Sequence, residues 1–179
     1  MLTTTTKAAT LLAVCCCILT HGADTDDLAG RWLSPCIPNG TATTQVGTID
    51  YQFTDSLLVA VYKVYWAPDC GASDDHLWTD SLRAIVRVVD TNAATGDDVR
   101  IDVVVMALMA RAESSDAADG ANQIEHYGYS DWEPGVVKDV AGRVSGTSGD
   151  TNAAVGEIRF GLLRIVQDSL FVGNLSGPF

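Results

Sequence analysis

The stretch Leu28-Ala29-Gly30-Arg31-Trp32-Leu33-Ser34-Pro35-Cys36 marks the point where a long β-rich region begins. Gly30 lets the backbone bend, and Trp32 supplies a large apolar side chain that can close one end of a core. Pro35 and Pro38 prevent a helix from forming here. We therefore expect Gly30 and Trp32 to be structural residues at the entrance to a β-domain.

Strand patterns occupy most of the chain after Val46. In residues 57–66 one face carries no charge, so we expect it to point inward; it consists of Leu58, Ala60, Tyr62, Val64 and Trp66. Residues 82–88 alternate apolar side chains with arginines, and residues 99–109 are the longest β run. These patterns predict an all-β fold. We expect an antiparallel up-and-down barrel of about eight strands, because closing a sheet removes its exposed edges. A β-sandwich is the alternative.

The C-terminal part is less regular. We expect an exposed loop over residues 114–119, a strand over residues 122–129 and a final hairpin made of residues 157–166 and 170–172. In the first strand of that hairpin the apolar residues change face at Gly161, which predicts a β-bulge.

Residues 1–22 have the features of a secretory signal peptide. Lys7 is the only charge before Asp24, and the apolar run of residues 8–19 is too short to span a bilayer. A lipoprotein with Cys15 as the lipidated residue is the alternative, although the bulky Val14 disfavours it. We expect residues 23–179 to form one secreted domain, or a periplasmic one in a bacterial host, without a transmembrane segment.

The cysteines and the sequons fit export. Three of the five cysteines, Cys15, Cys16 and Cys17, fall in the expected signal peptide. The other two, Cys36 and Cys70, most simply form one disulfide in an exported chain. Asn39 and Asn174 begin N-glycosylation sequons, which matter only in a eukaryotic host.

The net charge of −12 argues against binding to nucleic acid or to anionic membrane surfaces. The chain has no nucleophile elbow, phosphate-binding glycine loop or dinucleotide fingerprint, so no catalytic residue is predicted. We also expect no metal and no cofactor. The oxygen-rich loops at residues 90–98 and 150–152 lack the spacing of a calcium site. His76 and His126 would support a hydrolase only if the fold brought them together.

The apolar inner face suggests a ligand site. Tyr62, Trp66, Met106 or Met109, and Phe160 are candidates to line a cavity. A barrel of about eight strands is just wide enough to be filled by side chains or to hold one small ligand. Both alternatives remain open at this point.

Gly30-Arg31-Trp32 resembles the Gly-x-Trp motif of lipocalins. The resemblance implies a barrel whose end Trp32 closes against an arginine from a late strand, Arg159 or Arg164. The longer stretch to Cys36, with a tyrosine-rich strand ending near Cys70, is similar to the extracellular domain of adenomatosis polyposis coli down-regulated proteins. It is also similar to lipocalin-like bacterial exported proteins, which carry a late segment like residues 128–132. These relatives imply an apolar groove or cavity, which in the animal proteins is thought to engage a lipid-bearing signalling partner.

We therefore expect an exported, non-enzymatic binding protein for a small hydrophobic molecule or lipid. The alternative is an interaction module with a filled barrel that works through acidic loops or through Trp78 and Trp132. A hydrolase that uses His76 and His126 is the third hypothesis.

Overall fold

The computed structural model describes residues 28–38, 45–66, 70, 76–91, 98–144, 149, 151–166 and 169–173. The expected signal peptide, the sequon residues Asn39 and Asn174 and most of the two oxygen-rich loops lie outside the described residues. No helix in the described ranges has both the length and the apolar character that a bilayer crossing requires.

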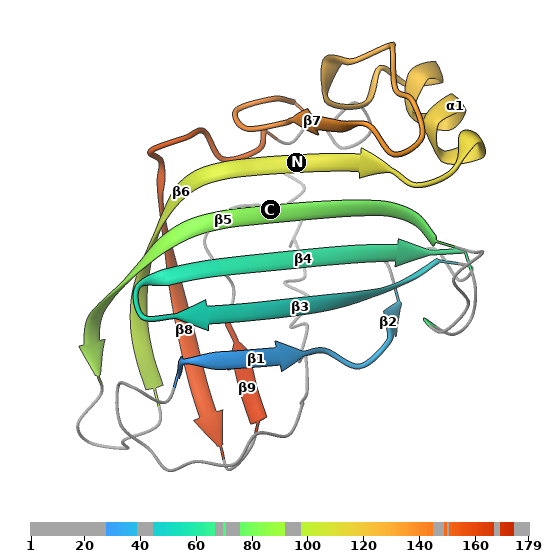
Figure 1. Ribbon diagram of the computed structural model, residues 1–179. Coiled ribbons are helices and arrows are strands. Elements are labelled where there is room, and N and C mark those ends of the chain that lie inside the picture. Colours follow the sequence, from blue (N-terminus) through green and yellow to red (C-terminus); the bar gives the residue numbers. More distant parts are fainter. Residues whose placement is uncertain are drawn as a thin grey trace, which may run out of the picture.

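One antiparallel sheet dominates the fold (Figure 1). Its strands are β1 (Gly30–Leu33), β2 (Ile37–Pro38), β3 (Val46–Thr54), β4 (Leu57–Tyr65), β5 (His76–Thr91), β6 (Asp98–Ala112), β7 (Val137–Asp139), β8 (Ile158–Val166) and β9 (Ser169–Val172). The strand order is β1-β3-β4-β5-β6-β8-β9, with β2 paired to β3 and β7 paired to β6. The sheet curls into a nearly closed barrel, so the predicted all-β barrel is confirmed and the sandwich alternative is wrong.

The inner face of the sheet follows the predicted alternation. Tyr51 lies opposite Ala60, which lies opposite Leu82, and Leu82 lies opposite Leu108. All four are buried in one apolar cluster that also includes residues of β1, β8 and β9. Because the period of a strand is two residues, this register turns the apolar faces of β3 and β4 toward the core, together with Leu82, Ala84 and Val86 of β5.

The strand β6 changes its buried face halfway along. Arg83 pairs with Ala107 and the next residue, Ala84, pairs with Val105, so Met106 is an extra residue in a β-bulge. The residues that point inward are therefore Ile101, Val103 and Val105 before the bulge, and Leu108, Ala110 and Ala112 after it. This shift explains why both faces of β6 look apolar in the sequence.

The segment after β6 was predicted incorrectly. Residues 114–119 are not a loop and residues 122–129 are not a strand, because α1 (Ser115–Gln123) and the short helix η3 (His126–Gly128) occupy this region. Ser114 caps α1 by accepting a hydrogen bond from the Ala117 backbone N–H. Ala118 and Ala121 are buried, since these small side chains let the helix pack closely on the barrel.

The predicted bulge at Gly161 is also wrong. The pairing of β8 with β6 runs without a shift from Ile158 to Arg164, and Gly161 lies opposite Ile101. The apolar residues on the other face of β8 therefore stay outside the barrel.

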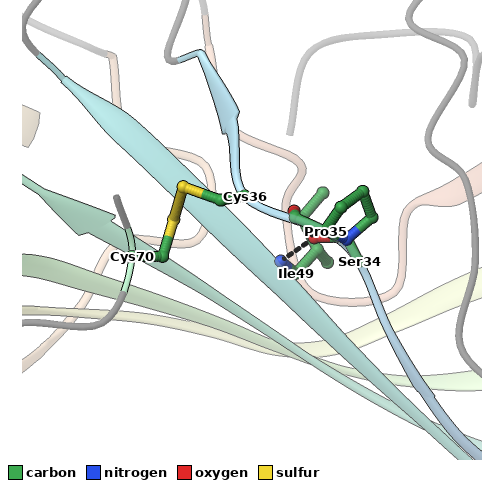
Figure 2. Close-up of a disulfide and its surroundings, with 5 residues drawn as sticks. All are labelled: Ser34, Pro35, Cys36, Ile49 and Cys70. Atoms are coloured by element: carbon green, nitrogen blue, oxygen red, sulfur yellow. Dashed lines mark hydrogen bonds between the residues drawn. A yellow bond between two sulfur atoms is a disulfide. The ribbon is translucent and has the colours of Figure 1, made fainter. Parts of the chain in front are cut away.

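The predicted disulfide is present (Figure 2). Cys36 and Cys70 are bonded, with 5.6 Å between their Cα atoms. The bond joins the residue just before β2 to the chain between β4 and β5. Beside it, Ser34 Oγ accepts a hydrogen bond of 2.7 Å from the Ile49 backbone N–H, which extends the β1–β3 pairing.

Candidate functional site

Of the predicted cavity residues, only Tyr62 lies on the inner face in the body of a strand. It pairs with Ile49 on β3 and with Asp80 on β5. Its ring crosses β3 at Gly47, where an added Cβ would lie 2.5 Å from Tyr62 Cε2. Gly47 thus makes room for the ring, which leans away from Asp80. Trp66 follows the end of β4 and is 56% exposed.

The other predicted cavity residues lie elsewhere. Phe160 is on the outer face of β8 opposite Asp102 and is 62% exposed, so its prediction as a cavity residue is wrong. Met106 occupies the β6 bulge and is 41% exposed. Met109 follows the bulge on the outer face, opposite Ser81 and Asp139. The bulge reverses the alternation that had placed Met109 inward.

Trp32 is a core residue, as predicted. It is 6% exposed, lies opposite Tyr51 and donates its indole N–H to the Leu28 carbonyl at 3.3 Å. Arg159 shares the inner face of β8 with buried Leu163, and its guanidinium forms an ion pair of 2.7 Å with Glu157.

Arg164 is exposed on the opposite face of β8. Of the two candidate arginines, Arg159 is therefore the one that faces the interior. A contact between Trp32 and either arginine remains a prediction.

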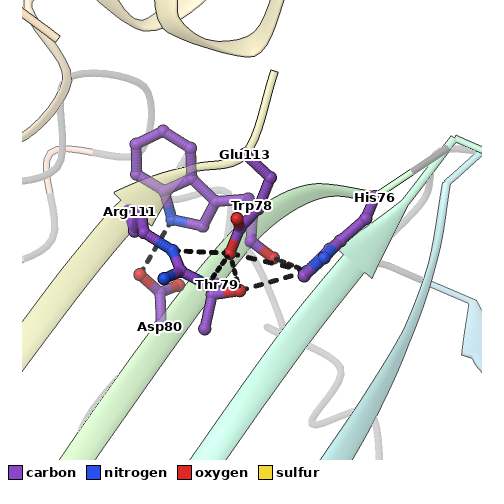
Figure 3. Close-up of polar contacts among 6 residues, drawn as sticks. All are labelled: His76, Trp78, Thr79, Asp80, Arg111 and Glu113. Carbon is purple, nitrogen blue, oxygen red and sulfur yellow. Dashed lines mark hydrogen bonds and ion pairs between the residues drawn. The ribbon is translucent and has the colours of Figure 1, made fainter. Parts of the chain in front are cut away.

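Asp80 is the acidic residue that stands out on the inner face. It lies between Tyr62 on β4 and Ala110 on β6. Its Oδ1 accepts a hydrogen bond of 2.8 Å from the Trp78 indole N–H (Figure 3). The side chain keeps some accessible surface, yet so much protein surrounds it that burial raises its pKa to about 6, against the opposing effect of the Trp78 hydrogen bond.

An aromatic cluster covers this end of the barrel. The Trp78 ring lies 4.8 Å from the Trp132 ring and 5.0 Å from the His126 ring, and His126 lies 4.0 Å from Tyr127. Trp132 is 3% exposed, and Asn122 holds its backbone with two hydrogen bonds. Trp78 is half-buried.

The titratable groups in the cluster are held in their neutral forms. Burial lowers the pKa of His126, whose Nδ1 is buried without a hydrogen-bond partner among the described residues. Burial raises the pKa of Tyr62 and of Tyr127, and the negative charge of Asp80 raises both further. Asp80 is therefore the group of this set that changes charge near physiological pH.

Among the described cations on the inner face, Lys138 is the nearest to Asp80 in the register of the sheet. It lies opposite Ala110, on the same face as Asp80 but across β6. Its ammonium forms an ion pair of 2.7 Å with Asp131 and lies 4.6 Å from the centre of the Tyr129 ring. Lys138 thus has its own acidic and aromatic partners.

The centre of the barrel is filled by side chains, while the end that contains Asp80 keeps accessible surface. On β5, Leu82, Ala84 and Val86 are buried. Toward the end that α1 and η3 cover, the inner face becomes half-buried, at Ile49, Tyr62, Trp78 and Asp80. The other end also has half-buried inner residues, Val99, Ile165 and Val172, all of them aliphatic. Aromatic and polar groups thus converge on accessible inner surface at the Asp80 end, as they do in small-molecule sites.

A separate polar cluster lies on the outer face of β5 (Figure 3). Thr79 donates its hydroxyl hydrogen to Glu113 Oε1, and Arg111 donates to the same oxygen at 2.8 Å. His76 Nε2 lies 3.2 Å from the Trp78 carbonyl oxygen, which can only accept, so Nε2 carries the hydrogen. His76 therefore cannot take the Thr79 proton at this nitrogen.

The hydrogen bonds and charges of this outer cluster favour a structural role for it. Burial raises the pKa of Glu113, but it is outweighed by the hydrogen bonds from Thr79 and Arg111 and by electrostatic interaction with Arg111 and His76, so the pKa is lowered overall. Burial lowers the pKa of His76. His76 and His126 lie on opposite faces of β5, on either side of Trp78, and the described residues contain no group of three metal ligands.

Sequence reasoning missed Asp80 and Tyr127. The signal for Asp80 was present, because Trp78, Asp80, Leu82, Ala84 and Val86 alternate on one face, with a single acid among apolar residues. Because the predicted strand begins at Leu82, this acid lies outside every predicted strand. Tyr127 could not be found this way, since it reaches the site from η3. No protein-family model matches the chain, and no curated protein sequence is significantly similar to it.

Proposed function

We propose that this protein is an exported, non-enzymatic binding protein that holds a small hydrophobic molecule at the Asp80 end of its barrel. The observation that carries the proposal is the accessible inner surface at Ile49, Tyr62, Trp78 and Asp80, beside a filled barrel centre. Aromatic and aliphatic groups there provide apolar contact, and few polar groups are available to orient a ligand.

Two further features support the proposal. The disulfide between Cys36 and Cys70 is compatible with an oxidising, extracellular compartment. The buried Trp32 on the first strand of a barrel agrees with the resemblance to lipocalins and lipocalin-like exported proteins. A membership in that group is part of the proposal, as is secretion after removal of residues 1–22.

The first test is native mass spectrometry of the mature protein made in an oxidising compartment. We expect a mass excess that disappears on organic extraction, and the extract then identifies the ligand. In addition, isothermal titration with 1-decanol should give saturable binding. A bare mass together with no binding of 1-decanol or of any other small apolar probe would contradict the proposal.

A pair of variants locates the site. Ile49→Phe enlarges a half-buried inner residue and should weaken 1-decanol binding by about tenfold, because it occupies ligand space. Val59→Phe makes the same kind of change on the other face of the sheet, on β4, and should leave the affinity unchanged. Equal effects of the two variants would place the ligand elsewhere.

The outer face of β8 favours a second candidate, an interaction module that pairs with a second copy of this chain. Ile158, Phe160, Leu162 and Val166 are all exposed there. On the adjacent strand β6, Arg100 and Asp102 lie two residues apart on this face. A twofold arrangement would place each arginine against the partner copy's aspartate, so the face is self-complementary in charge.

Light scattering tests the second candidate. The wild-type protein should be a dimer, and Phe160→Asp should make it a monomer without changing its far-ultraviolet circular dichroism. A wild-type monomer at high micromolar concentration would rule this candidate out.

A further inference from the structure

We infer that the ligand of the Asp80 end is an amine, with its ammonium group bound by the Asp80 carboxylate and its apolar body packed among Trp78, Tyr62 and Tyr127. This inference rests on the proposed function and names the chemical class of the ligand. It follows from the hydrogen bonds, the charges and the ring positions around Asp80.

The hydrogen bonds of Asp80 leave acceptor capacity unused. A carboxylate offers about four lone-pair sites. Across the described part of the chain, the Trp78 indole is its only hydrogen-bond donor. Asp80 as a whole residue is half-buried, so part of its surface remains accessible. A buried carboxylate is normally paired with a cation, so the accessible side of Asp80 is suited to an external one.

The protein's own cations are engaged elsewhere. Lys138 shares the face of Asp80 across β6, but its ammonium bonds to Asp131 and lies over the Tyr129 ring. Arg143 also stacks on Tyr129, at 3.9 Å from the ring centre, and the guanidinium of Arg111 is bound to Glu113 outside the barrel. These three cations therefore do not neutralise Asp80.

The aromatic groups favour an organic cation over a metal ion. The faces of tryptophan and tyrosine rings attract ammonium groups and also pack against apolar carbon. The Trp78 indole donates a hydrogen bond to Asp80, and Tyr62 lies opposite Asp80 on β4. Tyr127 is close enough to Asp80 that the negative charge of Asp80 raises the pKa of Tyr127. A metal ion would need further oxygen or nitrogen ligands, and the described residues supply no group of three.

The charge of the whole chain acts in the same direction. The net charge of −12 attracts cations and repels anions, so a fatty acid or a phosphate would approach this site against the field of the protein. Of the groups that face Asp80 from β4, β7 and η3, Tyr62, Tyr127 and His126 are neutral at pH 7, and Lys138 is paired. Asp80 therefore controls the charge preference.

The test compares three probes of similar size by isothermal titration at pH 7.5: 2-phenylethylamine, the neutral 2-phenylethanol and the anionic 3-phenylpropionate. We expect the amine to bind about tenfold or more tightly than the alcohol, and the carboxylate to bind most weakly. In Asp80→Asn the preference for the amine should disappear while the alcohol still binds. Asp119→Asn, which removes an exposed carboxylate from α1, should bind like the wild type.

The pH dependence of the wild type gives a second readout that needs no variant. Protonation of Asp80 should weaken amine binding as the pH falls from 7.5 to 5, while alcohol binding stays nearly constant. Equal affinities for amine and alcohol would overturn this inference but leave the proposed function standing. A bare native mass together with no binding of the three probes or of 1-decanol would overturn both.

Discussion

At the scale of single residues, the ionised Asp80 side chain lowers the stability of the fold but favours the binding of a cation. Burial raises its pKa from 3.8 to about 6, so the folded protein holds a proton more tightly than the unfolded chain does. At neutral pH the residue is ionised in a poorly solvated place, with one hydrogen bond. Residues held in this way are common at functional sites because the ligand, not the fold, completes their environment.

Asp80→Asn should therefore stabilise the protein at neutral pH. Between about pH 4 and pH 6 the wild type loses stability through this group as the pH rises, and above pH 6 the whole loss is present. Asparagine stays neutral and can still accept the Trp78 hydrogen bond. Urea unfolding at pH 7.5 should show a gain of up to about 3 kcal/mol for the variant, which vanishes near pH 4.

Asp119→Asn is the control for this measurement, since it removes an exposed carboxylate. Its unfolding curve should follow that of the wild type at both pH values. If Asp80→Asn were less stable than the wild type at pH 7.5, the ionised carboxylate would be a stabilising group, and our account of it would be incorrect.

Trp32 and Trp66 provide a matched pair for the stability of the barrel. Trp32 of β1 is buried in the core opposite Tyr51 of β3, whereas Trp66 is 56% exposed after β4. Trp32→Ala should lower the free energy of unfolding by about 3–5 kcal/mol, because it removes a large side chain from a packed core. Trp66→Ala should lower it by less than about 1 kcal/mol. Urea titration of both variants checks this, and a small loss for Trp32→Ala would exclude its role as a core residue.

At the scale of elements, the disulfide cross-links the chain at one edge of the sheet. Cys36 and Cys70 lie 34 residues apart, and the closed loop includes β2, β3 and β4. In the oxidised protein, thiol labelling should find neither cysteine reactive. The double variant Cys36→Ala, Cys70→Ala should lose about 3–4 kcal/mol, since the open chain regains loop entropy when it unfolds.

Reduced wild-type protein is the control for the double variant, and both should show the same unfolding midpoint. A double variant as stable as the oxidised wild type would mean that strand pairing alone stabilises this edge of the sheet. The pairing is not weak, because β1 and β2 both hydrogen-bond to β3 and Ser34 bridges the gap between them.

The elements also show where tertiary contacts decide local structure. The β6 bulge at Met106 lets one long strand turn Val105 inward before it and Leu108 inward after it. This strand pairs with β8 through its first half and with β7 through its last residues. Without the bulge, the second half would turn Met109 and Arg111 toward the aromatic cluster.

At the scale of the whole molecule, the barrel is asymmetric along its axis. The centre is filled by side chains from β3 to β8, while one end combines accessible inner surface with a cover made of α1 and η3. Small residues contribute to this difference, because Ala110 and Ala112 on β6 lie opposite Asp80 and Trp78. The helix η3 brings His126 and Tyr127 onto that same surface, and the chain after it brings Trp132.

The sequence by itself determined the all-β class, the inward face of β4, the alternation over residues 82–88 of β5 and the disulfide. These follow from local alternation, in which each strand buries every second residue, and from the pairing of the two cysteines that remain after the expected signal peptide. Only the tertiary structure decided the bulge in β6, the outward position of Phe160 and the helix α1. The reason is that each of these depends on which neighbouring strand or surface covers a segment, and alternation within the segment carries no such information. The tertiary structure also decided the candidate site, because Asp80 and Tyr127 lie far apart in the chain and come close to each other only after the barrel has formed.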